Sequence, residues 1–140
     1  MKYIQNGQNY LMRLEKGELL VENLNRLVED EKIGGAWLSG LGAASWAELG
    51  YYDLEGQAYH WKKFEELMEI TSIQGNVAWD GDKPVIHMHG TFSGQDMKAF
   101  GGHIRELEAG GTVEIFVQKF GQDKITRSQD EKTGLKLLDL

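Results

Sequence analysis

The stretch "KPVIHMHGTF", Lys83–Phe92, predicts a strand with two chemically different faces. Successive side chains of a strand point to opposite faces, so Met88 and Phe92 would share one face. His87 and His89 would share the other. We therefore expect the apolar face to pack on a core and the histidine face to look into water or into a cleft.

Strand-like segments dominate the rest of the chain. They are rich in β-branched and aromatic residues, and turn residues separate them. The predicted strands are Asn9–Glu15, Gly35–Ala43, Ser45–Asp53, Gln57–Phe64, Glu66–Asp80, Lys83–Phe92 and Gly111–Phe120. A closing hairpin is expected within Lys124–Leu140, and a short helical or irregular segment is expected between Phe92 and Gly111.

One segment, "KGELLVENLNRLVEDEKIG" (Lys16–Gly34), has the period of a helix, and Gly34 supplies its stop. The apolar residues that recur at helical spacing are Leu20, Leu24, Leu27 and Val28. An amphipathic helix of about four turns is expected. Glycines inside the strand-like runs favour bulges and a curved sheet. The predicted fold class is α+β: residues 1–140 form a single domain, in which one long helix packs on a large, mostly antiparallel sheet.

Length and composition limit the class of protein. A chain of 140 residues is long enough to bury a core without disulfides or structural metals. It contains no cysteine, so histidine and carboxylate would have to hold any metal ion. There is no long apolar run and no basic start followed by an apolar segment. We therefore expect no membrane span, no secretory signal and a cytoplasmic location.

The charge disfavours direct binding of nucleic acid. The chain has 15 lysines and arginines against 22 aspartates and glutamates, which gives a net charge of −7. Proteins bind DNA largely by neutralising its phosphates with a basic patch. A free-standing DNA-binding protein is therefore disfavoured, although a local basic patch on an oligomer stays open.

The histidines are the main chemical resource. Residues two apart on a strand have backbones about 6.5–7 Å apart, so the imidazoles of His87 and His89 can close around one ion. His103 follows Gly101 and Gly102, whose missing side chains let the backbone approach a neighbouring strand closely. Three neutral imidazoles plus water is the open arrangement of catalytic zinc. Spacing alone leaves open that the three are unrelated surface imidazoles.

Five motifs, in this order along the chain, carry a family resemblance. They are "GLGA" (Gly40–Ala43), "LGYYD" (Leu49–Asp53), "EITSIQGN" (Glu69–Asn76), "HMHGTFS" (His87–Ser93) and "GGHI" (Gly101–Ile104). With them, the chain from about Tyr10 onward resembles the plants and prokaryotes conserved (PPC) domain. The resemblance implies an α+β fold, a homotrimer, and a zinc ion held by the histidines at positions 87, 89 and 103. The DNA-binding label of that family comes from plant members with a separate AT-hook, which this sequence lacks.

A second resemblance concerns the fold, since the PPC domain is similar to acetolactate decarboxylase, which also holds zinc with histidines. If the chain were an enzyme, zinc would act as a Lewis acid or supply hydroxide, a carboxylate would move the proton, and an arginine would hold an anion. The candidates are Glu69 and Glu114 for the carboxylate and Arg105 for the arginine. The alternative is that these carboxylates are solvated and that Arg105 forms a surface ion pair.

Three hypotheses follow. The first is a zinc-binding homotrimer with a regulatory or DNA-associated role, which binds DNA weakly or not at all and takes a small anionic ligand near the metal. The second is a zinc-dependent decarboxylase or hydrolase that acts on a small oxo-acid or ester. The third is a structural trimer with surface histidines and no metal.

Overall fold

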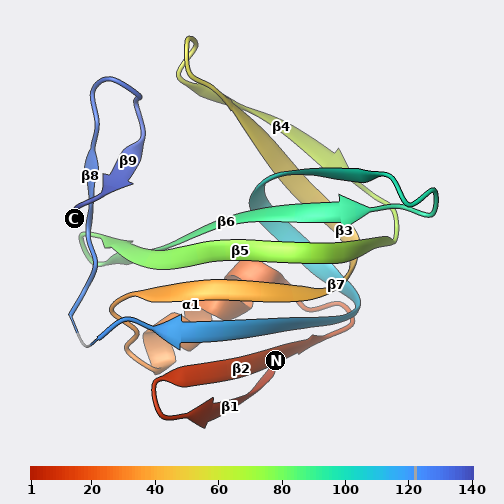
Figure 1. Cartoon of the computed structure of the whole chain (residues 1–140), viewed down its shortest axis with the longest axis horizontal. Helices are drawn as coiled ribbons and strands as arrows, with labels where there is room; N and C mark the ends of the chain where they lie inside the picture. The colour runs from red at the N-terminus through yellow and green to blue at the C-terminus, as the bar shows by residue number, and fades with distance from the viewer. Residues whose placement is uncertain (122) are drawn as a thin grey trace.

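A large antiparallel sheet and one helix make up most of the molecule (Figure 1). The computed structural model of the chain describes residues 1–121 and 123–140. Within them, seven strands hydrogen-bond in the order β1-β2-β7-β6-β5-β3-β4. The elements are β1 (Lys2–Asn6), β2 (Asn9–Glu15), α1 (Leu20–Asp30), β3 (Ala36–Asp53), β4 (Ala58–Phe64), β5 (Met68–Asp80), β6 (Lys83–Ser93), β7 (Ala99–Lys119), β8 (Arg127–Gln129) and β9 (Lys136–Leu138). The predicted α+β class is confirmed.

The sheet curves back on itself because β3 and β7 are long and bulged. β3 pairs with β4, β5 and β7, while β7 also pairs with β2 and β6, so that β3, β5, β6 and β7 form a closed circuit of strands. The register of β3 shifts between Gly40 and Gly42. Gly42 has φ +148°, and a Cβ there would lie 2.3 Å from the Thr112 carbonyl oxygen. Only glycine fits this bulge, which agrees with the prediction that glycines mark bulges in a curved sheet.

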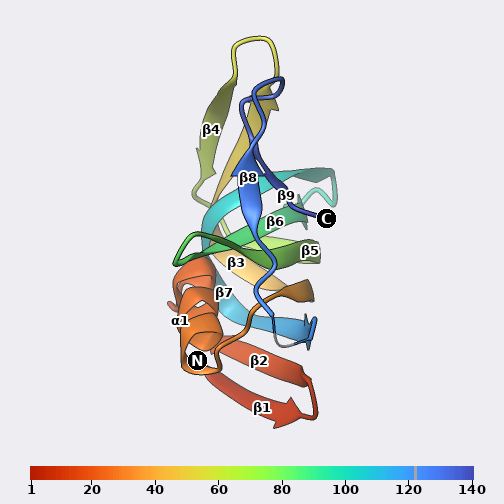
Figure 2. The same ribbon diagram turned by 90° about the vertical axis from the view of Figure 1, so that its left-hand side faces the viewer.

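Helix α1 covers one face of the sheet, and Figure 2 shows the opposite face open. The four apolar residues that predicted the helix are all fully buried, as are Met12, Met88, Phe92 and Ile115 of the strands beneath it. Within the described residues, no helix is long and apolar enough to cross a membrane.

The prediction between Phe92 and Gly111 was wrong, because Ala99–Lys119 is one continuous strand. Its glycines weaken the local strand signal, but hydrogen-bonded partners on both sides hold this segment extended. The two strands predicted over 35–43 and 45–53 are likewise one strand, since bulges carry β3 around the bend.

The first strand and the length of the helix also differ from the prediction. β1 was not predicted, because all five of its residues are exposed and no burial pattern marks it. The helix has 11 residues, fewer than four turns, because Gly17 (φ +87°) and a hydrogen bond from Glu18 N to Glu15 O place a turn before it.

The closing hairpin is confirmed as β8 and β9, which form a separate two-stranded sheet. It stands beside one end of β5 and β6 in Figure 1. Trp79 N donates to Ile125 O at 2.8 Å, and Tyr52 Oη donates to Thr133 O at 2.7 Å. The hairpin is therefore tied both to β5 of the main sheet and to the part of β3 that pairs with β4.

Candidate metal centre

The pairing of β6 with β7 brings the third histidine to the other two. His89 lies opposite His103 in the register, followed by Gly90 opposite Gly102 and Thr91 opposite Gly101. A Cβ at Gly101 would lie 2.3 Å from the carbonyl oxygen of Gly90. The close approach expected from the two glycines is therefore present.

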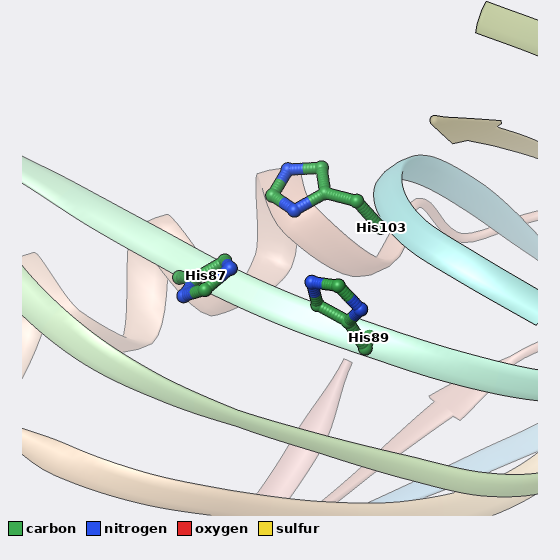
Figure 3. Close-up of side chains that lie close together, drawn as sticks. All are labelled: His87, His89 and His103. Carbon is green, nitrogen blue, oxygen red and sulfur yellow. The ribbon is translucent and has the colours of Figure 1, made fainter. Parts of the chain in front are cut away.

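The three imidazoles converge (Figure 3). One nitrogen of each lies within 4.8 Å of one nitrogen of the others, and the ring centroids of His87, His89 and His103 are 5.2–5.4 Å apart. Nitrogens at 2.0–2.1 Å from a tetrahedral zinc lie roughly 3.4 Å apart. Small side-chain rotations would therefore bring the three rings into ligand positions.

The electrostatics of the cluster favour the neutral forms of His87 and His103. Burial, with smaller contributions from the nearby positive charge of Arg127 and from His89, lowers the pKa of His87 to about 4. Burial likewise lowers the pKa of His103 to about 4, with help from the other two histidines. Metals bind the neutral form. Among residues 1–121 and 123–140, the buried Nδ1 atom of His103 finds no hydrogen-bond partner, so the donor set fits a metal ion.

Sequence reasoning missed a second group beside the cluster, Arg127 on β8. Its Nη2 donates to Asn76 Oδ1 at 2.8 Å and lies 3.5 Å from His87 Nδ1. The Tyr59 ring centroid is 5.0 Å from that of His103. No local signal marks Arg127, because only the docking of the closing hairpin brings it to the histidines.

A hollow of about 220 Å³ adjoins the cluster on this side. His87, His103 and Arg127 are among the residues that line it. The remaining walls are mostly aliphatic, from Val85, Ile86, Leu135 and Leu137.

The residues nominated for catalysis lie apart from this hollow. Glu69 is exposed and pairs in the register with Ser93, four residues beyond His89 on β6, which is about 13 Å along a strand. Glu114 is exposed and lines a different hollow, with Leu41 and Phe116.

Arg105 is closer to the cluster but already has partners. Its Nη1 donates to Glu48 Oε1 at 3.2 Å, and its guanidinium lies 5.1 Å from the centroid of the Trp61 ring. That ring meets His103 edge-on, with centroids 5.9 Å apart. The fourth histidine, His60, is exposed on β4 and lies outside the cluster.

Known structures share this fold over nearly the whole chain. A "Putative DNA-binding protein" from Ralstonia eutropha JMP134 is 33% identical, with a TM-score of 0.93, over 99% of this chain and 96% of that one. A metal-containing protein from Archaeoglobus fulgidus is 35% identical, with a TM-score of 0.89, over 97% and 96%. A plant- and prokaryote-conserved (PPC) protein from Pyrococcus horikoshii is 29% identical, with a TM-score of 0.89, over 99% and 95%.

More distant likenesses concern the fold alone. Alpha-acetolactate decarboxylase from Bacillus subtilis strain 168 is 10% identical, with a TM-score of 0.58, over 93% of this chain and 60% of that one. A search of the curated proteins found no match. The family described as the Plants and Prokaryotes Conserved (PCC) domain matches residues 1–121. The chain therefore belongs to the Plants and Prokaryotes Conserved domain family, as the motifs predicted.

Proposed function

We propose that this protein binds one zinc ion through His87, His89 and His103. The observation that carries the proposal is the convergence of three imidazoles, one of which, that of His103, has a buried Nδ1 with no hydrogen-bond partner among the described residues. Histidine nitrogens suit zinc, and no cysteine or carboxylate joins the group among the described residues. The metal-containing protein from Archaeoglobus fulgidus supports a metal in this family.

The role that we propose is that of a zinc-binding homotrimer with a regulatory or DNA-associated function. The Ralstonia eutropha neighbour supports the association with DNA. The net charge of −7 argues that direct contact with DNA is weak or absent. Self-association is supported by apolar side chains on the open face of the sheet, where Leu11, Leu41 and Phe116 are 49%, 55% and 41% exposed.

A second candidate is a zinc-dependent enzyme that acts on a small oxo-acid or ester. Three protein ligands would leave a zinc coordination position open, and a hollow adjoins the histidines. Zinc would supply a Lewis acid at that position. Glu69, Arg105 and Glu114 remain the predicted proton carriers and anion contact of such an enzyme.

Elemental mass spectrometry of the purified protein tests the zinc proposal. We expect about one zinc per chain in the wild type and in His60→Ala, which removes a histidine outside the cluster. His87→Ala and His103→Ala should lose the metal while circular dichroism shows that they are folded. A wild type that stays free of metal after zinc is supplied would overturn the proposal.

Light scattering on the same samples tests the homotrimer. We expect three times the chain mass for the wild type and for the folded variants. A monomer at micromolar concentration would contradict the trimer without affecting the zinc proposal.

A further inference from the structure

Arg127 is a cation with unused hydrogen-bonding capacity at the wall of the hollow. Nη1 donates to Lys136 O and Nη2 to Asn76 Oδ1, both at 2.8 Å, while Nε is buried and has no partner in the part of the chain that the structure describes. Both acceptors are neutral. Among the residues that the structure describes, no carboxylate forms an ion pair with Arg127. Arginine forms its strongest hydrogen bonds to carboxylate and phosphate.

Metal binding at His87 would remove one possible hydrogen-bond acceptor from Arg127. The 3.5 Å contact between Nη2 and His87 Nδ1 is long for a hydrogen bond, and a guanidinium nitrogen can only donate. A metal on Nδ1 would take the lone pair of that atom. A metal on Nε2 of a neutral imidazole would leave Nδ1 protonated and facing a donor. In either case His87 no longer accepts from Arg127.

Within the described part of the chain, no acidic residue lines the hollow to balance these cations. The ammonium group of Lys136, the other cation at its wall, pairs with Asp80. A zinc ion on three neutral imidazoles and the guanidinium of Arg127 would together carry about three positive charges beside aliphatic walls. Such a site favours an anion that has an apolar portion.

We propose that the hollow binds a short-chain monocarboxylate, whose carboxylate pairs with Arg127 beside the metal and whose aliphatic end lies against Val85, Ile86, Leu135 and Leu137. This proposal rests on the proposed zinc site, because the metal supplies most of the positive charge. A hollow of about 220 Å³ has room for several water molecules and so for a small acid of about six or seven non-hydrogen atoms. Butyrate and 2-oxobutyrate have that size, and a phosphate group would leave the aliphatic walls unused.

Isothermal titration of the full-length, zinc-loaded protein with butyrate and 2-oxobutyrate tests the proposal. We expect both to bind the wild type, and Arg127→Gln to weaken them at least about tenfold. Arg127→Lys keeps the positive charge but lacks the planar guanidinium, which can donate two parallel hydrogen bonds. Its affinity for the two acids should lie between that of the wild type and that of Arg127→Gln. Arg26→Gln, which removes an exposed charge on α1, is the matched control and should bind like the wild type.

A second variant guards against a structural effect of losing Arg127, whose Nη1 also holds the hairpin. Val85→Phe fills the hollow and leaves Arg127 and the histidines in place, so it should weaken butyrate by a similar factor. Binding to Arg127→Gln that equals the wild type would overturn the proposal, as would inorganic phosphate that binds as tightly as butyrate.

Metal content, measured on every sample, separates the two proposals. Zinc present and butyrate unbound would overturn the carboxylate proposal alone. If zinc is absent but butyrate binding still depends on Arg127, the pocket stands and the zinc proposal fails. Absence of both would overturn both.

Discussion

Two partly buried polar side chains on β7, His103 and Glu106, lie three residues apart and differ in their hydrogen bonding. Glu106 is fully engaged: Oε1 accepts from Val21 N at 2.7 Å and from Leu107 N at 3.0 Å, and Oε2 accepts from Glu22 N at 3.2 Å. It thereby caps the N-terminus of α1, whose own first residues supply no side-chain cap. His103, in contrast, has a buried Nδ1 for which the described residues supply no hydrogen-bond partner.

Burial acts on both groups and disfavours the charged form of each. It raises the pKa of Glu106 and lowers the pKa of His103 to about 4. The two groups differ in their surroundings. Three backbone N–H groups donate to the carboxylate of Glu106, whereas the neighbours of His103 include two other imidazoles. A satisfied polar group stabilises the fold, whereas a buried polar atom without a partner marks a place for a ligand.

The largest expected effect is that of zinc on stability. Zinc at 100 times its Kd should stabilise the wild type by about 2.7 kcal/mol, because only the folded chain presents the three histidines together. Thermal unfolding with and without zinc measures this, and a chelator should reverse it. His103→Ala should show no zinc effect, and equal stabilisation of that variant would contradict the assignment of His103.

The second-largest expected effect tests Gly101, the glycine that lets β7 approach β6. Gly101→Ala would place a Cβ 2.3 Å from the Gly90 carbonyl, so the strands must separate at a cost of about 1–3 kcal/mol in unfolding free energy. Zinc affinity should also fall, since His103 would move away from His89. Gly111→Ala is the matched control on the same strand, because a Cβ there meets nothing within 4 Å. Urea titrations that fail to separate these two variants would sink the prediction.

The other half of the comparison is tested at Glu106. Glu106→Ala leaves two donors of the first turn of α1 without their acceptor and should cost about 1 kcal/mol. Zinc content should not change, because the carboxylate serves the helix and not the cluster. The exposed Glu29→Ala on the same helix should stay within about 0.5 kcal/mol of the wild type in urea unfolding. Loss of zinc in Glu106→Ala would contradict this division.

The smallest effect at neutral pH concerns the metal-free protein. His87 and His103 have pKa values of about 4 in the fold and 6.5 when unperturbed, so the unfolded chain binds more protons between these values. Stability should therefore fall as the pH drops from 6.5 towards 4, and it should be unaffected by the two groups above pH 7. Urea midpoints at pH 7, 6 and 5 measure this. A His87→Gln, His103→Gln double variant should decline less steeply, and an equal decline would refute the prediction.

Much of the fold followed from local patterns. The buried face of α1 and the apolar face of β6 were predicted correctly, because helical and strand periods are properties of consecutive residues. The same strand period predicted that His87 and His89 lie on one face of β6. β1 and the first half of β7 could not be predicted this way, since their extended form depends on partners distant in the chain.

By itself, the sequence determined the class of the fold, its family, and a histidine pair followed by a third histidine behind two glycines. Only the tertiary structure decided that His103 lies opposite His89, that Glu106 caps α1, and that Arg127 reaches His87 from the closing hairpin. The physical reason is that alternation and helical period act between neighbours in sequence, whereas register, burial and unpaired hydrogen-bonding atoms exist only once distant strands have met.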